Sequence, residues 1–174
     1  MGTRKFWDNP GDAHELTFTC YQRSTLFDDS SVRDQFVGHL ATVKAQLELS
    51  LLAYVVMPEH VHLLVWSKRV DVPKTLSQVK SSFAFYLLKE WKDNADPRIE
   101  LCVTPQGDHR FWQAGGGYDR NIFSPEAFEA SIAYIHNNPV KRGLVQSSEE
   151  WLWSSAMAYF KDDDSGIVTL WSRS

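Results

Sequence analysis

Two histidines separated by one residue are the side chains in this sequence best suited to chemistry. His60 and His62 follow Pro58 and Glu59 and lead into the apolar run Leu63 to Trp66. The run is short and rich in Val and Leu, which favours a β-strand. Side chains two apart on a strand leave the same face. The pair therefore forms a compact bidentate site for a divalent metal.

Two histidines on a strand face are more often packed or solvated than metal-bound, and this alternative has to be weighed. Here the strand is apolar on both faces, so the polar pair stands where polar groups are costly. Pro58 cannot donate to a sheet ladder, which puts the pair at the start of the strand, near the rim of the sheet. Glu59 precedes the strand, and simple alternation predicts that it points away from the histidine face.

The elements around the pair predict an α+β fold. A first strand is expected over 16–21, a helix over 32–50, two strands over 51–57 and 60–67, and a helix over 73–91. A final strand would complete a ferredoxin-like, split βαβ antiparallel sheet with helices on one face. Residues 110–113 are the better candidate for that strand, and 99–104 the weaker.

The C-terminal third predicts a helical tail. Ser124 and Pro125 form a strong helix start, and Pro139 predicts a helix end at Asn138. The aromatic residues from Trp151 to Phe160 are expected to cover the core rather than to stack on bases. His109 and His136 are expected to be structural or surface residues.

Length and composition predict one domain over residues 1–174, with 1–13 and 161–174 irregular. The chain has no signal-peptide core and no apolar run of membrane-spanning length, and its two cysteines make no disulfide framework. A cytoplasmic protein that spans no membrane is therefore expected. The net charge of −4 argues against non-specific coating of nucleic acid, but not against a local basic surface. The candidate DNA-binding residues are Lys68, Arg69, Lys80, Arg120, Lys141 and Arg142.

Three segments together resemble a known family. Residues 57–64, MPEHVHLL, look like the HUH motif (His, hydrophobic residue, His) of single-strand DNA transposases, and residues 111–121, FWQAGGGYDRN, look like the region of its nucleophile. Residues 134–145, YIHNNPVKRGLV, followed by WLWSS, are similar to the tail of the REP-associated tyrosine transposases. The pair HVH alone would be a weak signal, but three motifs in this order and spacing are a strong one.

The resemblance implies a ferredoxin-like fold and a single-tyrosine enzyme that nicks and transfers single-stranded DNA. By this resemblance the histidines bind Mg²⁺ or Mn²⁺, and a tyrosine attacks a phosphodiester to form a 5′-phosphotyrosine. Tyr118 is the expected nucleophile, because it follows a glycine joint that could carry it to the metal. Three other tyrosines are expected to be buried in a strand or in helices: Tyr54, Tyr86 and Tyr134.

The resemblance also implies a third metal ligand, an amide or similar group about one helical turn past the tyrosine. Asn121 lies three residues after Tyr118 and is the expected ligand, with Gln113 as a second possibility. The expected partner is single-stranded or hairpin DNA, and the protein is a monomer or a homodimer. Two alternatives stay open: a catalytically silent protein that binds DNA hairpins, and a hydrolytic metalloenzyme that uses the histidines alone.

Overall fold

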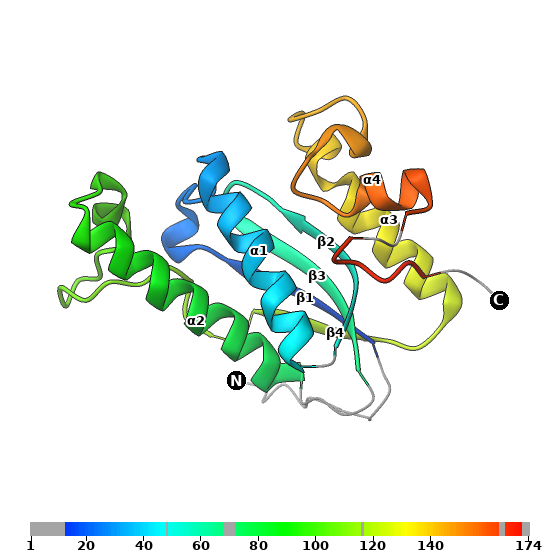
Figure 1. Ribbon diagram of the computed structural model, residues 1–174, viewed down its shortest axis with the longest axis horizontal. Coiled ribbons are helices and arrows are strands. Elements are labelled where there is room, and N and C mark those ends of the chain that lie inside the picture. Colours follow the sequence, from blue (N-terminus) through cyan, green and yellow to red (C-terminus); the bar gives the residue numbers. More distant parts are fainter. Residues whose placement is uncertain (1–12, 48, 68–71, 116, 164–165, 172–174) are drawn as a thin grey trace.

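The computed structural model describes residues 13–47, 49–67, 72–115, 117–163 and 166–171. Four strands form one antiparallel sheet in the order β2-β3-β1-β4. They are β1 (Ala13–Thr19), β2 (Ser50–Val56), β3 (His60–Trp66) and β4 (Tyr118–Ile122). This is the strand order of a ferredoxin-like sheet, and the predicted α+β class is confirmed (Figure 1).

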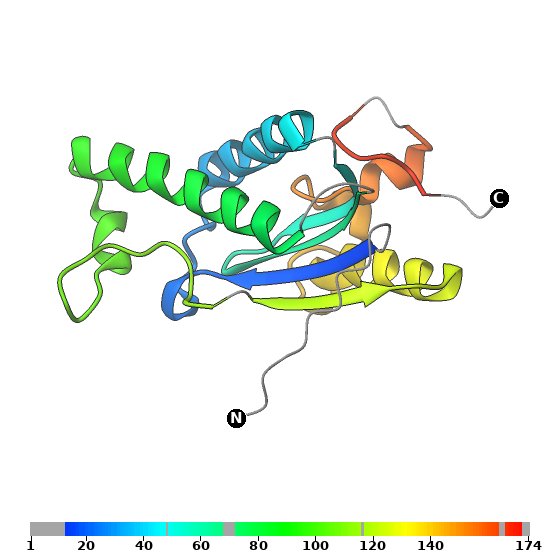
Figure 2. The same ribbon diagram turned by 90° about the horizontal axis from the view of Figure 1, so that it is seen from below.

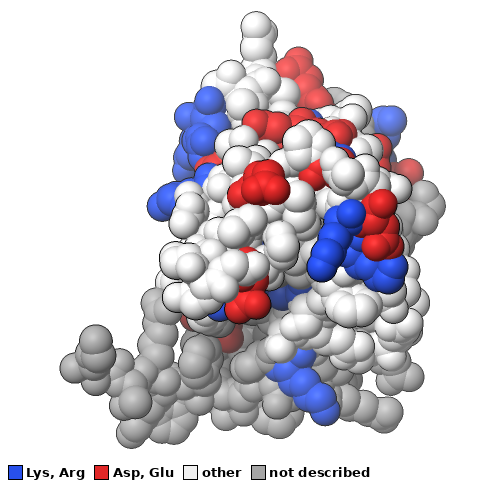
Figure 3. All heavy atoms as spheres, turned by 90° about the vertical axis from the view of Figure 1, so that its left-hand side faces the viewer, with Lys and Arg blue, Asp and Glu red and all other residues white. Residues whose placement is uncertain are grey.

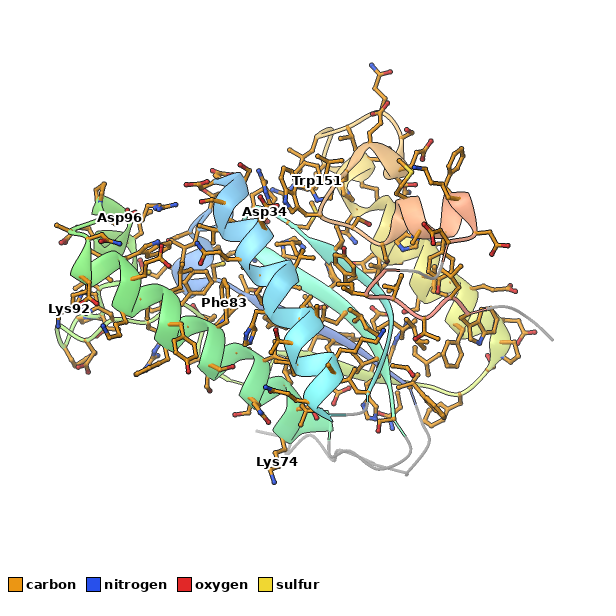
Figure 4. The ribbon with its side chains drawn as sticks, viewed as in Figure 1. Asp34, Lys74, Phe83, Lys92, Asp96 and Trp151 are labelled. Atoms are coloured by element: carbon orange, nitrogen blue, oxygen red, sulfur yellow. The ribbon has the colours of Figure 1, made fainter. Side chains whose placement is uncertain are left out.

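Two long helices cover one face of the sheet. They are α1 (Ser30–Leu47) and α2 (Val72–Asp93), and they enclose the larger apolar core together with side chains such as Leu16, Val61 and Leu63. Phe83 of α2 lies inside this core, in contact with the rings of Phe27 and Phe36 (Figure 4). The sequence predicted these elements because the apolar residues recur with helical and strand periods.

The C-terminal helical tail lies on the opposite face of the sheet (Figure 2). It contains α3 (Pro125–Lys141), a 3₁₀ turn over Ser148–Glu150, and α4 (Ala156–Lys161). Ile132 and Ile135 of α3 pack with Ala53 and Val55 in a second apolar layer. Helices therefore cover both faces of the sheet, and the site described below lies on the α3 face.

Aromatic side chains fasten the tail to the rest of the molecule, as expected. The indole of Trp151 donates to the carbonyl of Val56, and that of Trp153 donates to Asp34 on α1 (Figure 4). The guanidinium of Arg33 lies 3.8 Å from the ring centroid of Trp153 and 5.1 Å from that of Trp151. Stacking of a cation on these rings closes α1 against the tail.

The final strand was predicted in the wrong place. Residues 97–102 form a 3₁₀ helix, and 110–113 form irregular chain with a single bridge from Trp112 to Cys20. Phe111 and Trp112 are apolar because they fill the core beneath α2, not because they pair in a ladder. The true edge strand, β4, is polar and half-exposed, so hydrophobicity gives it no signal.

Gly117 sets the entry into β4. Its φ is +78°, and a Cβ atom there would lie 2.2 Å from the carbonyl oxygen of Thr17. The glycine is therefore required for a close approach of two backbones. Tyr118, the residue after this glycine, is the first residue of β4 and pairs with Thr17.

Helix α3 continues past the proline that was expected to end it. It begins as predicted, with the Ser124 side chain accepting from the backbone of Ala127, but it runs through Pro139 to Lys141. The last turn survives the missing N–H because the Arg142 amide donates to Asn138, and Gly143, with a φ of +68°, lets the Leu144 amide donate to Pro139.

No helix in the described part of the chain is long and apolar enough to cross a membrane. Cys20 and Cys102 are both buried and form no disulfide with each other.

Candidate functional site

His60 and His62 extend from the same face of β3, as predicted. Their rings are nearly perpendicular, with centroids 4.8 Å apart, and their Nε2 atoms are 3.0 Å apart. Two adjacent ligands in octahedral geometry, each about 2.1 Å from an ion, lie about 3.0 Å apart. The two nitrogens are therefore spaced as neighbouring ligands of one small divalent cation.

The other ring nitrogens are held by neighbours that set the tautomers. The Nδ1 atom of His60 is 3.1 Å from Glu59 Oε1, and that of His62 is 2.8 Å from the Thr17 hydroxyl. An ionised carboxylate only accepts, so His60 carries its proton on Nδ1 and turns the Nε2 lone pair toward His62. Thr17 can accept from His62 as well, which leaves both Nε2 atoms as ligands when a cation lies between them.

Burial keeps both imidazoles neutral. Burial, together with a smaller effect of the nearby His60, lowers the pKa of His62 to about 3. Burial also lowers the pKa of His60, although Glu59 opposes the shift. Neutral imidazoles are the form that binds metal, so the pair supplies two ligand atoms suited to a divalent cation. Within the described residues no third His, Cys or carboxylate completes a cluster with the two histidines.

Glu59 does not point away from the histidines, so that prediction was wrong. Its side chain folds back from the turn to bind the ring of His60, and Arg142 Nη1 lies 2.6 Å from the same Oε1 atom. Alternation fails here because β3 begins only at His60. Burial raises the pKa of Glu59, but the hydrogen bond and the charge of Arg142, together with the contact to His60, outweigh it, so the pKa is lowered overall.

Tyr134 of α3 lies against the histidine pair. Its ring meets that of His62 edge to face, with centroids 5.4 Å apart, and 42% of the residue is exposed. The prediction that Tyr134 is buried in its helix was therefore wrong. The ammonium of Lys141, two turns further along α3, lies 5.0 Å from the centroid of the Tyr134 ring. A partly exposed tyrosine ring thus packs against His62, with an ammonium group beside it.

Tyr118, the expected nucleophile, is farther along the same face. It pairs with Thr17, and Thr17 pairs with His62, so β1 separates the tyrosine from the histidine strand. Two strand spacings put the backbones of Tyr118 and His62 about 10 Å apart.

Asn121, the expected third metal ligand, lies away from the histidine face. Asn121 lies three residues after Tyr118 in β4, so the two side chains leave opposite faces of the sheet. It pairs with His14, and Leu16, two residues further along the same face of β1, belongs to the core under α1 and α2. Its side chain therefore leaves the sheet on the face opposite His60 and His62. Gln113, the second possibility, uses its carbonyl oxygen to accept from the amide of Gln22.

Asn138 is a residue that sequence reasoning missed. It lies one helical turn after Tyr134 on α3, is 9% exposed, and donates through Nδ2 to the Tyr134 carbonyl. Residues four apart share a helix face, which places its amide on the Tyr134 side. The signal was present in the sequence, as an amide at this spacing after a tyrosine inside a predicted helix.

Glu15, on β1, anchors α3 to the sheet, and the sequence analysis did not identify it as a residue of the site. Its buried carboxylate accepts from Ser131 Oγ at 2.5 Å and from Arg120 Nη2 at 2.7 Å. Ser131 precedes Tyr134 by about one turn. A charge-assisted bond at this point sets the register of the helix over the histidines.

The predicted DNA-binding residues have different surroundings. Lys68 and Arg69 lie outside the described residues. Lys80 donates to the carbonyl of Gly115, Arg120 pairs with Glu15, and Arg142 pairs with Glu59. Lys141 alone of the described four has its charge beside the Tyr134 ring. Basic and acidic residues are mixed on the end of the molecule seen in Figure 3, so that end carries no patch of one sign.

His136 is structural, as expected, and it predicts an acid-sensitive fold. Burial lowers its pKa to about 4, and its Nε2 atom lies 2.7 Å from Ser155 Oγ. Between pH 6.5 and 4 the unfolded state binds a proton that the folded state does not. Stability should therefore fall as the pH falls through this window, by up to about 3 kcal/mol.

Urea unfolding of the wild type and of His136→Gln, compared at pH 7 and pH 4.5, measures this effect. As the pH falls, the free energy of unfolding of the wild type should decrease more than that of the variant. An identical pH dependence of both proteins would contradict the expectation.

Comparisons with known proteins indicate the family and the fold of the chain. The family described as "Transposase IS200 like" matches residues 12–138. A Haemophilus influenzae protein, provisionally named a REP-associated tyrosine transposase, is 27% identical over 105 residues. That match covers 59% of this chain and only 56% of the relative, so the chain spans little more than half the length of that protein.

Two solved structures share the fold. The first is a REP-associated tyrosine transposase bound to a REP hairpin; it has a TM-score of 0.71 and 19% identity, over 100% of this chain and 93% of that one. The second is a provisionally named transposase of Deinococcus radiodurans R1, with a TM-score of 0.50 and 22% identity, over 79% of this chain and 97% of that one. At these identities the likeness supports the fold.

Proposed function

The chain belongs to the IS200-like transposase family, and from that premise we propose that it nicks and rejoins single-stranded DNA at hairpins. One observation carries the proposal: an exposed tyrosine on α3 and two paired imidazoles on β3 meet on one face of the sheet. A strand of DNA lying over this face would reach both groups at once. Tyr134 is the proposed nucleophile, in place of Tyr118.

In the proposed reaction the Tyr134 oxygen attacks phosphorus, and the bond from phosphorus to the 3′ oxygen breaks. The products are a 5′-phosphotyrosine and a free 3′-hydroxyl, which takes up the proton. Rejoining reverses the step with another 3′ end. The nearby charge of Lys141 favours a phosphate beside the phenol, because an ammonium attracts both the phosphate and a developing phenolate.

His60, His62 and Asn138 would hold the divalent metal. The ion supplies charge stabilisation and orientation to the oxygens of the scissile phosphate. Asn138 takes the place that was expected for Asn121, because it follows Tyr134 by one turn and lies on the site face. Asn138 Oδ1 would be the ligand atom, since its Nδ2 donates to the Tyr134 carbonyl.

One chain would be sufficient for the reaction. Tyr134 contacts His62 of its own chain, and α3 is anchored to its own sheet through Ser131 and Glu15. No tyrosine helix has to come from a second copy, so we propose an active monomer. The solved relative bound to a REP hairpin makes hairpin DNA the first substrate to test. The packing of Tyr134 against His62 favours cleavage over silent hairpin binding.

End-labelled DNA with a palindromic hairpin and single-stranded flanks, incubated with the protein and Mn²⁺, tests the proposal. We expect a nick in a flank and a covalent protein–DNA adduct on a denaturing gel, with neither product from the matched duplex. Because the protein is acidic overall, we expect it to contact few phosphates, so the slope of log affinity against log salt should be shallow, about −0.7 for each phosphate neutralised. Tighter binding to random duplex than to the hairpin, or activity without any adduct, would contradict the proposal.

A further inference from the structure

The carboxylate of Glu59 joins the two halves of the site. Glu59 is 6% exposed, and its Oε1 atom lies 3.1 Å from His60 Nδ1 and 2.6 Å from Arg142 Nη1. Arg142 is the residue that ends α3, the helix of Tyr134. We propose that Glu59 is a positioning residue that orients His60 toward the metal and couples it to the end of the tyrosine helix. This inference rests on the proposed function.

The surroundings of Glu59 argue that this contact is more than a surface ion pair. Exposed pairs contribute little to stability, whereas a buried carboxylate is costly unless it is fully hydrogen-bonded. Here the second oxygen, Oε2, is buried and has no partner among the described residues. The turn is held rigidly, because the Cys20 amide donates to the Glu59 carbonyl and the Phe27 amide to that of Pro58.

The two contacts have distinct effects on the chemistry. The bond to His60 keeps the proton on Nδ1 and the lone pair on Nε2, which is the form that binds a metal. The bond to Arg142 ties the last turn of α3 to the same carboxylate. Since Tyr134 lies two turns earlier on that helix, the tyrosine and the metal-binding imidazole share one anchor. Glu59 thus acts through His60 and α3.

Glu59→Gln keeps the size of the side chain but removes its charge. Its oxygen accepts more weakly, and its NH₂ group either lies buried without an acceptor or turns toward Nδ1 and favours the wrong tautomer. We expect the affinity of the DNA-free protein for Mn²⁺ to fall about tenfold to a hundredfold, measured by calorimetry. Glu100→Gln, on an exposed 3₁₀ turn, is the matched control and should retain wild-type affinity.

Arg142→Ala separates this role from the DNA contact predicted from the sequence. If Arg142 acts through Glu59, Arg142→Ala should lower the Mn²⁺ affinity of the otherwise wild-type protein. In the Glu59→Gln variant the same substitution should lower the Mn²⁺ affinity little further. The turnover rate at saturating Mn²⁺ should fall more than the KM for hairpin DNA rises. A pure phosphate contact would instead leave Mn²⁺ affinity unchanged and reduce the salt slope of DNA binding by about 0.7 to 0.9.

The outcomes separate the inference from the function beneath it. Wild-type protein that binds no Mn²⁺ and forms no adduct would remove the proposed function itself. If the wild type binds Mn²⁺ and the folded Glu59→Gln variant binds it with equal affinity, the inference about Glu59 is wrong but the proposed function stands. Strictly additive effects of the two substitutions on Mn²⁺ affinity would also overturn it, because the shared carboxylate requires coupling. Arg142 is half-exposed, so its variant should fold even if Glu59→Gln does not.

Discussion

Tyr134→Phe is expected to abolish both DNA cleavage and the covalent adduct. The substitution removes one oxygen and keeps the ring that packs on His62, so the fold and the binding of Mn²⁺ and hairpin DNA should change little. Loss of an attacking group lowers turnover by roughly a millionfold in a well-studied hydrolase, and a loss beyond detection is expected here. End-labelled hairpin DNA on a denaturing gel measures both products.

Tyr118→Phe is the matched control, because it makes the same change on the same face of the sheet. It should retain the adduct, since β1 lies between Tyr118 and the histidine strand. The reverse pattern, with an adduct from Tyr134→Phe and none from Tyr118→Phe, would return the nucleophile to Tyr118. Adducts from both single variants would mean that another residue attacks the phosphate.

Loss of either imidazole is expected to remove metal binding. His60→Ala and His62→Ala each delete one of two nitrogens that lie 3.0 Å apart, and each leaves only one imidazole and the Asn138 amide as proposed protein ligands. Because changes behind a metal ligand already cost about tenfold to a hundredfold, loss of a ligand should weaken Mn²⁺ binding by more than about a hundredfold. Cleavage should vanish with it.

Calorimetric titration with Mn²⁺ measures the affinity, and thermal unfolding in a chelator checks that each variant is folded. His109→Ala, at an exposed position away from the sheet, controls for loss of a histidine as such. Unchanged Mn²⁺ affinity in both site variants would show that the ion binds elsewhere. Cleavage that persisted without Mn²⁺ binding would remove the metal from the proposed reaction.

Much of the fold could be predicted from the sequence, because those signals are local. The helices α1 and α2 and the strands β2 and β3 each carry an apolar period that depends on no distant partner. The shared face of His60 and His62 is equally local, since alternation along one strand fixes it. These are the parts of the prediction that the structure confirms within a few residues at each end.

The fourth strand could not be predicted in this way. Phe111 and Trp112 are the apolar residues of their region, yet they fill a core formed by distant aromatic rings. Tyr118 to Ile122 is largely polar and becomes a strand only because β1 offers an open edge. An edge strand gains its order from backbone pairing with a partner, and composition does not reveal that partner.

The local pattern of residues predicts that a pair of imidazoles opens β3, and the three motifs predict a family of tyrosine enzymes. Which tyrosine lies against that pair depends on how α3 packs on the sheet. Tyr134 reaches His62 because α3 docks on the far face of the sheet, through Ile132, Ile135 and the bond from Ser131 to Glu15. Helical spacing places residues on a face of their own helix. It does not say which face of the sheet the helix covers, since that depends on burying two apolar surfaces together.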